Sequence, residues 1–335
     1  MSEAADVLQL AVTFDALTNI TFWTSVGVLA GTYTIFSLGL QINVGYTGVL
    51  NFGQVGFSAI GAYTMAILVT DTGINFWLSL PIAILVAMAF GLLVGLPSLR
   101  LRADYFAIAT IAASEAIRLV ALNSQDLTGG SQGIFGFDES WDSAQETIEG
   151  WLMDLGWSDP ETLFPLFLVV WVVALLLTFA LTRLQRTPWG RVLRAVREDE
   201  DAARALGKNV FAYKLQSLAI AAGIAAIAGF FVAINLRFVI PDAFLPTFTF
   251  LGYAALVLGG LASYWGVAIG AIILQTIFEG LRFIELEGSS FFGTEIGEVQ
   301  IAALRFILVG LALILLMAFR PQGIFGKREE MVLGE

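Results

Sequence analysis

Long apolar runs separated by short polar segments make up most of the chain from residue 21 onward. A helix that crosses a bilayer needs about 20 apolar residues. The runs are continuous rather than alternating, so they predict helices and not the strands of a barrel. We expect an all-α membrane protein, a polytopic bundle of about nine transmembrane helices, within a range of about eight to ten. The expected spans are Thr21–Asn43, Asn51–Thr70, Trp77–Pro97, Tyr105–Ala121, Thr162–Leu181, Tyr213–Asn235, Phe248–Ala262, Trp265–Leu281 and Gln300–Phe319.

The composition agrees with a membrane location. Apolar residues make up 58% of the 335 residues and charged residues only 13%, whereas ordinary soluble domains have about 45–50% and about 25%. No charged residue occurs from Ala16 to Thr70, and no Lys or Arg precedes Arg100. We therefore expect residues 1–335 to form a single transmembrane domain.

The basic residues orient the predicted spans. If nine spans are counted, the basic segments around Arg100, at 183–213 and at 320–335 fall on one side, which the positive-inside rule makes cytoplasmic. The N-terminus and the segment 122–161, which carries Asp and Glu but no Lys or Arg, then face outward. The sequence thus predicts an N-out, C-in chain with an acidic extracytoplasmic loop at 122–161, a cytoplasmic loop at 183–213 and a cytoplasmic tail at 320–335.

Several classes of chemistry are excluded by missing residue types. The chain has no Cys and no His, which removes thiolate ligands and most zinc sites, so no metal site is expected. The net charge of −11 argues against nucleic acid as a partner. Arg outnumbers Lys and the outer loops are acidic, a bias that would suit a salt-loving host.

The segment Gly45–Tyr63, GYTGVLNFGQVGFSAIGAY, is unusually rich in glycine for a lipid-facing helix. Irregular backbone at membrane depth is tolerated only where protein or a water-filled cavity satisfies it. One interpretation is a broken or re-entrant element beside a transport pathway, with Asn51 and Gln54 as polar lining residues. The other is a Gly-rich loop and tight helix crossing, with the two amides capping helix ends.

An ionisable pair lies within the fourth predicted span. Glu115 and Arg118 are about one helical turn apart and can pair on the same face. Ionisable groups at this depth often mark a functional path. The alternative is a structural ion pair near the outer end of the helix.

The segment Thr187–Lys214 carries the clearest local signals. Thr187 precedes Pro188 as a helix N-cap should, Asp199, Glu200 and Asp201 suit the first turn of a second helix, and Gly207 suits its left-handed end. We expect two short helices that form a rigid cytoplasmic protrusion. It serves either as a lipid-anchored basic segment or as a docking surface for a cytosolic partner.

No catalytic apparatus is visible in the sequence. The phosphate-binding pattern G-x-x-x-x-G-K-[ST] does not occur. If ATP drives transport, the nucleotide must bind to another chain. We therefore expect a protein that is not an enzyme and binds no cofactor itself, with ATP and Mg²⁺ held by partner subunits.

Together, several stretches make the chain resemble the permease subunits of bacterial and archaeal ATP-binding-cassette (ABC) importers for branched-chain amino acids. The resemblance is to the member of the permease pair with the longer cytoplasmic motif, and it covers most of the chain. The stretches that carry it are Gly45–Tyr63, Arg102–Arg118 with Leu127–Gly133, Trp189–Lys214, Leu258–Gly270 and Pro321–Gly326.

The resemblance implies a cytoplasmic coupling loop that seats in the ATPase subunit. The residues that the resemblance places in this coupling loop are Gly190, Arg191, Ala195, Arg197, Glu198, Glu200, Ala202, Ala203 and Gly207. Arg194 of the same basic segment is added to this set. The implied partners are two cytosolic ABC ATPase subunits, a second related permease subunit and an extracytoplasmic substrate-binding protein. The resemblance also implies that the chain is a multi-pass protein in contact with the lipid of a prokaryotic cell membrane.

The expected mechanism is alternating access driven by the partner ATPases. The candidate polar residues for the substrate's ammonium and carboxylate groups are Asn51, Gln54, Tyr63 and Glu115. Two alternatives remain open: an ABC permease for urea or short-chain amides, and an ion-coupled secondary transporter.

Overall fold

The computed structural model describes residues 20–157, 162–261 and 263–280, with isolated positions between 290 and 325. The longer helices are α2 (Ile20–Gln41), α3 (Gln54–Thr70), α4 (Phe76–Ser98), α5 (Ala103–Asn123), α7 (Glu139–Asp154), α8 (Phe164–Leu184), α9 (Pro188–Glu198), α11 (Val210–Leu236), α12 (Pro246–Gly259) and α13 (Tyr264–Gly280). The shorter ones are the π-helix η1 (Ile42–Tyr46), α6 (Gln125–Thr128), α10 (Glu200–Ala205) and the 3₁₀-helix η2 (Pro241–Phe244). Two antiparallel pairs of short strands complete the described elements: β1 (Ile134–Phe135) with β2 (Phe238–Val239), and β3 (Ser290–Phe291) with β4 (Thr294–Glu295).

The predicted all-α membrane class is confirmed. Within the described part of the chain, six stretches are long and apolar enough to cross a membrane, and α3 and α13 are apolar but shorter. The six stretches are Ile20–Tyr46, Phe76–Ser98, Ala103–Asn123, Phe164–Leu184, Val210–Leu236 and Pro241–Gly259.

The predicted count of nine spans and the N-out, C-in orientation stay predictions. The ninth expected span, Gln300–Phe319, lies mostly outside the described residues, as do the N-terminus and the tail 320–335.

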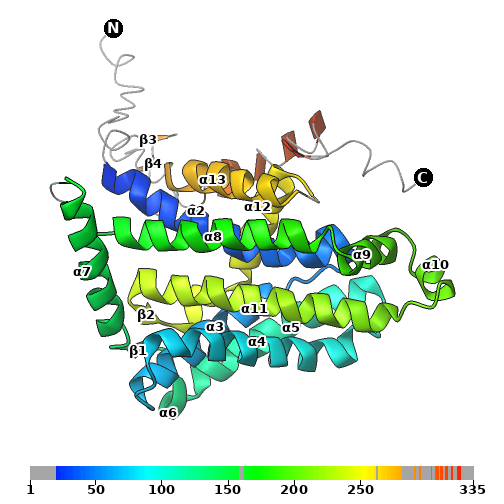
Figure 1. Ribbon diagram of the computed structural model, residues 1–335, viewed down its shortest axis with the longest axis horizontal. Coiled ribbons are helices and arrows are strands. Elements are labelled where there is room, and N and C mark those ends of the chain that lie inside the picture. Colours follow the sequence, from blue (N-terminus) through cyan, green and yellow to red (C-terminus); the bar gives the residue numbers. More distant parts are fainter. Residues whose placement is uncertain are drawn as a thin grey trace, which may run out of the picture.

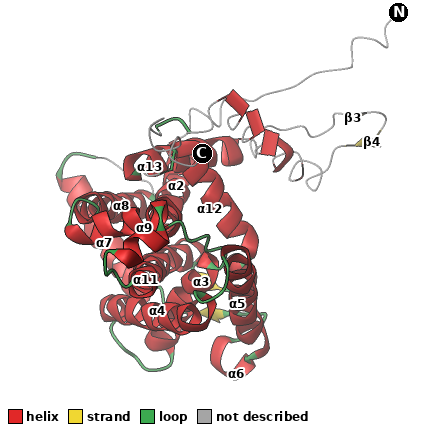
Figure 2. Cartoon of the chain, turned by 90° about the vertical axis from the view of Figure 1, so that its right-hand side faces the viewer, coloured by secondary structure: helices red, strands yellow, loops and turns green. Residues whose placement is uncertain are grey.

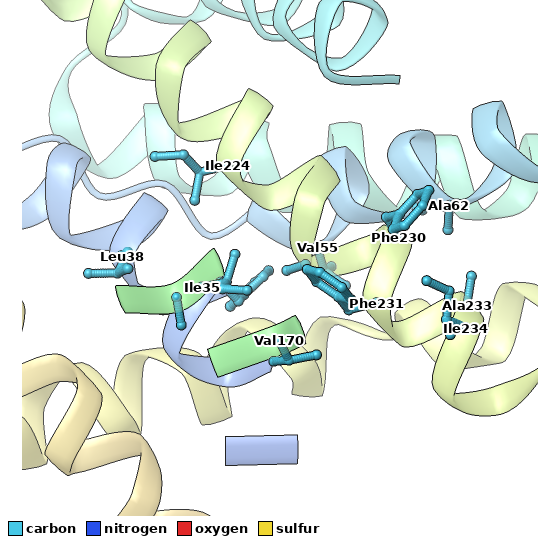
Figure 3. Close-up of a cluster of buried hydrophobic side chains, with 14 of the residues drawn as sticks. Ile35, Leu38, Val55, Ala62, Val170, Ile224, Phe230, Phe231, Ala233 and Ile234 are labelled. Atoms are coloured by element: carbon cyan, nitrogen blue, oxygen red, sulfur yellow. The ribbon is translucent and has the colours of Figure 1, made fainter. Parts of the chain in front are cut away.

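Helices α2 and α11 form the centre of the bundle (Figures 1 and 2). In each of them 83% of the apolar stretch is buried, against 28% in α4, 22% in α5 and 33% in α8. Side chains from α2, α3, α8 and α11 meet in the main hydrophobic cluster, with Ile35, Val55, Val170 and Phe231 among those drawn in Figure 3. The outer helices therefore present most of their apolar surface outward, as a membrane protein requires.

Small residues allow the central helices to approach closely. A Cβ atom added at Gly229 of α11 would lie 1.9 Å from the Ser58 carbonyl oxygen of α3, and one added at Gly61 would lie 2.5 Å from Ala226 Cα. Such glycines let two backbones come into contact in membrane bundles. The contact between α3 and α11 fixes the position of the Gly-rich segment Gly45–Tyr63.

The two loop regions expected from the sequence, 122–161 and 183–213, lie at opposite ends of the bundle (Figure 1). Helices α9 and α10 project from one end, and α7 runs across the other. The segment 122–161 contains the acidic helix α7 and the strand β1. Arg237 at the end of α11 holds α7 in place through Asp138 (3.5 Å) and Asp142 (2.9 Å).

Candidate functional site

The predicted capping residues begin helix α9. Thr187 is the N-cap, with its Oγ1 accepting a hydrogen bond from the Gly190 amide, and Pro188 is the first helical residue. Proline suits this position because its missing N–H would have no helical partner. The predicted start of the protrusion is confirmed.

The second short helix, α10, also follows the prediction. Asp199 Oδ1 accepts from the amides of Asp201 (2.8 Å) and Ala202 (3.0 Å), which caps the helix. Gly207 follows the last turn with φ of +78°, a conformation that glycine adopts without steric cost. Two capped helices joined through Asp199 form a compact protrusion.

Helix α9 has a buried face and a solvent face. Leu193 and Val196 are buried, and Val196 packs with Ala203 of α10 and Val210 of α11. The exposed residues of the predicted coupling set include Arg191, Ala195, Glu198 and Ala202. The first three follow helical spacing along one side of α9, so they form a continuous surface available to another protein.

Two further arginines of the predicted set, the exposed Arg194 and the half-buried Arg197, contact the protein's own bundle. Arg197 Nη1 donates to the Gly45 carbonyl oxygen of η1 at 2.6 Å. The Arg194 guanidinium lies 5.7 Å from the centre of the Tyr46 ring, within the range of a cation–π contact. The basic segment is therefore divided between solvent and the bundle.

The remaining members of the set stabilise the protrusion. Gly190 is buried, and an added Cβ atom would lie 2.4 Å from the Gln185 carbonyl oxygen. Glu200 pairs with Arg204 at 3.0 Å and with Lys214 of α11. Beside this pair, a cavity of about 220 Å³ opens between α10 and the start of α11.

The Gly-rich segment is a broken helical element. After α2 the chain continues as the π-helix η1, leaves the helical conformation at Gly48 with φ of +69°, and becomes helical again at Gln54. The structure confirms the interruption. The predicted span beginning at Asn51 starts three residues later as a helix because residues 48–53 are irregular.

The two amides of this segment are fully buried and hydrogen-bonded. Asn51 Nδ2 donates to Gln54 Oε1 at 2.8 Å, and Gln54 Nε2 donates to the Ala221 carbonyl oxygen of α11 at 2.9 Å. Asn51 Oδ1 also accepts from the Gly53 amide. Both amides thus tie the start of α3 to itself and to α11.

Two threonines from other helices complete the start of α3. Thr110 Oγ1 of α5 accepts from the Phe52 amide, and Thr249 Oγ1 of α12 accepts from the Val55 amide, each at 3.2 Å. The first amides of a helix have no partner within it. Sequence reasoning missed both threonines, because no local pattern links them to α3.

The predicted pairing of Glu115 with Arg118 is confirmed, with 2.6 Å between Arg118 Nη2 and Glu115 Oε1. Arg118 Nη1 also contacts Asp242 Oδ1 of η2 at 3.2 Å, a residue that sequence reasoning missed. Tyr63 lies on α3, with its ring 6.4 Å from that of Phe244 in η2. Its buried hydroxyl has no hydrogen-bond partner among the described residues.

The described residues contain no group of three or more Asp or Glu placed to hold a metal ion. Carboxylates at both ends of the bundle pair instead with arginine or lysine, as in Glu115 with Arg118 and Glu200 with Lys214. These described carboxylates therefore form ion pairs.

Known proteins are similar to this chain over most of its length. A family model described as "Branched-chain amino acid transport system / permease component" matches residues 23–319. The high-affinity branched-chain amino acid transport system permease protein LivM of Escherichia coli K12 is 36% identical over 314 residues, which cover 89% of this chain and 69% of that protein. A probable branched-chain amino acid transport permease protein LivM of Methanocaldococcus jannaschii is 29% identical over 332 residues, which cover 89% of this chain and 91% of that protein.

A further relative is the E. coli K12 permease protein LivH, which is 27% identical and covers 90% of this chain and 93% of its own length. No solved structure matches the chain.

Proposed function

The chain belongs to the family of branched-chain amino acid transport system permease components, and on that premise we propose that it is the transmembrane permease subunit of an ABC importer for branched-chain amino acids. The family is a transport permease component, so the predicted resemblance and the expectation that the chain is not an enzyme are confirmed. With its apolar helices, it is a multi-pass membrane protein. The urea, amide and ion-coupled alternatives gain no support from these relatives, nor does the suggestion of a salt-loving host.

One observation supports the coupling role most directly: α9 and α10 project from one end of the bundle with a free surface of Arg191, Ala195, Glu198 and Ala202. The buried residues Leu193, Val196 and Ala203 hold these helices against the bundle. A rigid surface held in this way can transmit a movement of the partner to the bundle. A flexible loop would change its own conformation instead and transmit little of that movement.

The proposed assembly follows from this surface and from the family. The protrusion seats in one of two cytosolic ABC ATPase subunits, which bind ATP and Mg²⁺, since a permease component binds no cofactor itself. A second, related permease subunit completes the membrane pathway in a prokaryotic cell membrane. An extracytoplasmic binding protein delivers substrate at the end that carries α7.

The proposed pathway must accept an apolar side chain and a zwitterionic backbone. Asn51, Gln54, Tyr63 and Glu115 are the proposed polar contacts for the ammonium and carboxylate groups. The Tyr63 hydroxyl supports this role, because it is buried without a partner among the described residues. Buried polar groups left unsatisfied need an explanation, and a ligand that binds in one state of a transport cycle provides one.

Purification of the tagged chain from its native membrane tests the assembly. Wild type is compared with Glu198→Arg on the protrusion and with Glu146→Arg on α7 as a matched control, since both glutamates are exposed. We expect wild type and Glu146→Arg to carry an ATPase subunit and Glu198→Arg to lose it, together with leucine uptake. An uptake that follows an ion gradient, with no ATPase present, would contradict the proposal.

Tyr63→Phe tests the pathway, because it removes only the hydroxyl. We expect weaker uptake of leucine, isoleucine and valine with unchanged thermal stability. Transport that is unchanged in Tyr63→Phe, and in alanine variants of Asn51, Gln54 and Glu115, would show that these residues do not contact substrate.

A further inference from the structure

Two contacts connect the protrusion to a single short element of the bundle, the π-helix η1. Arg197 donates to the Gly45 carbonyl oxygen, and Arg194 lies over the Tyr46 ring. Arg197 is half-buried in this position. Its hydrogen bond is charge-assisted and short, which makes it one of the stronger links that a side chain forms with backbone.

The Gly45 carbonyl is available because the helix ends there. The last carbonyls of a helix have no amide partner within it and are often satisfied by a basic side chain. Directly after η1 the chain turns at Gly48, whose added Cβ atom would lie 4.0 Å from Arg197 Cβ. Arg197 therefore caps the combined α2–η1 helix and lies against the turn that follows it.

Inside the bundle, η1 is connected to α11. Ser217 Oγ of α11 lies 3.5 Å from Asn43 Oδ1 and 3.4 Å from Thr47 Oγ1. Thr47 Oγ1 in turn donates to the Asn43 carbonyl oxygen at 2.5 Å. Asn43 is fully buried, and its Nδ2 has no hydrogen-bond partner among the described residues. A π-helix with an unsatisfied amide is the type of local irregularity that is frequent at functional sites.

From η1, only residues 48–53 separate the protrusion contact from the amides of α3. Those residues are irregular and include Asn51, which donates to Gln54 at the start of α3, and Gln54 in turn donates to the Ala221 carbonyl oxygen of α11. A displacement of Gly45 therefore reaches the start of α3 through a short irregular segment, which begins with a hydrogen bond of 2.9 Å from the Val49 amide to the Asn43 carbonyl oxygen of η1.

We propose that Arg197 is a positioning residue that transmits movement of the protrusion to η1 and the start of α3, rather than a contact of the ATPase. This inference rests on the proposed coupling function of α9 and α10. It divides the predicted coupling residues by role: the exposed Glu198 meets the partner, and Arg197 transmits the movement inward.

The variants Arg197→Ala and Arg197→Lys test the inference, with Arg183→Ala as the matched control. Arg183 is an exposed arginine at the end of α8 that lies over Phe179. Three quantities are measured in the whole complex: the ATPase that co-purifies, the ATP hydrolysed, and the leucine transported.

We expect Arg197→Ala to retain the ATPase and its hydrolysis but to transport on the order of tenfold less leucine per ATP, a scale typical of coupling between two sites. Arg197→Lys, which keeps a charged donor, should recover part of the ratio, and Arg183→Ala should match wild type. A purely structural role would lower transport and hydrolysis together at an unchanged ratio.

Three results would overturn the inference alone: loss of the ATPase from Arg197→Ala, an unchanged ratio of transport to hydrolysis, or no recovery in Arg197→Lys. Absence of any ATPase from wild type would overturn the proposed function and this inference together, so the two failures are distinguishable.

A cross-link provides a second test that does not depend on side-chain charge. The Cβ–Cβ distance between positions 48 and 197 is 4.0 Å, within the roughly 3.5–4.5 Å that disulfides require, and the chain has no other Cys. In the double variant Gly48→Cys/Arg197→Cys, oxidation should restore coupling that reduction removes. Gly48→Cys alone controls for the positive φ of that residue, and an oxidised double variant no better coupled than the reduced one would refute the inference.

Discussion

Arg118 on α5 contacts Asp242 of η2 with 3.2 Å between Nη1 and Oδ1, while its other nitrogens hold Glu115. The two carboxylates differ in their surroundings: the side chain of Glu115 is 35% exposed and that of Asp242 is 72% exposed, against 14% for Arg118. Arg118 therefore pairs with one partly enclosed carboxylate, Glu115, and with one solvent-exposed carboxylate, Asp242.

We predict that Glu115→Gln lowers the free energy of unfolding by about 1–2 kcal/mol, because Arg118 loses a charged, partly enclosed partner. Asp242→Asn should cost less than about 1 kcal/mol, since solvent screens an exposed pair. Thermal unfolding of the purified variants in detergent measures both. Equal losses would mean that Arg118 depends on Asp242 as much as on Glu115.

The two threonines at the start of α3 provide a second prediction. Thr249→Val removes the acceptor of the Val55 amide and should destabilise the protein by about 1–3 kcal/mol, because a buried donor is left unsatisfied. Thr178→Val is the matched control: that hydroxyl is also buried but donates only to the Ala174 carbonyl oxygen of its own helix, so its loss should be nearly neutral. Similar melting temperatures for the two variants would contradict this account of the α3 start.

Helix packing gives a third prediction. Gly229→Ala places a methyl group 1.9 Å from the Ser58 carbonyl oxygen, so α3 and α11 must separate, at a cost of about 3 kcal/mol or more. Gly150 on α7 has nothing within 4 Å, and Gly150→Ala should be stabilising or neutral because alanine favours helix by about 1 kcal/mol. The yield of monodisperse protein on size exclusion distinguishes the two, and a normal yield of Gly229→Ala would show that this crossing can relax.

The local features of α9 and α10 could be predicted from the sequence because their determinants are local. Thr187, Pro188, Asp199 and Gly207 each act on backbone within a few residues. The structure uses Thr187, Pro188 and Gly207 in the predicted roles, whereas Asp199, predicted in the first turn of the second helix, is its N-cap. The apolar runs likewise predicted the helices, because length and hydrophobicity decide whether a segment can cross a bilayer.

The contacts between distant residues could not be predicted in this way. Arg197 and Gly45 are 152 positions apart, and Arg118 and Asp242 are 124 apart. Nothing in a single sequence indicates which of three evenly spaced arginines faces the bundle and which faces solvent. That depends on how Leu193 and Val196 turn α9 against α11, a tertiary property.

The orientation of the chain gives a fourth prediction, which needs only two single cysteines in a chain that has none. Gly150 lies exposed on α7, and Leu206, at 78% exposure, lies at the end of α10. Between them α8 has 21 apolar-rich residues, about 32 Å of helix at 1.5 Å per residue, which matches a hydrocarbon core of about 30 Å. The two positions should therefore lie on opposite sides of the membrane.

If the basic protrusion is cytoplasmic, a membrane-impermeant maleimide should label Gly150→Cys in intact cells and Leu206→Cys only after permeabilisation. The wild-type chain, without cysteine, sets the background. Labelling of Leu206→Cys alone in intact cells would invert the orientation and place the Arg-rich surface outside, where no cytosolic ATPase can reach it. Labelling of both would show that α8 does not span, because it is the one described helix between the two positions that is long and apolar enough to do so.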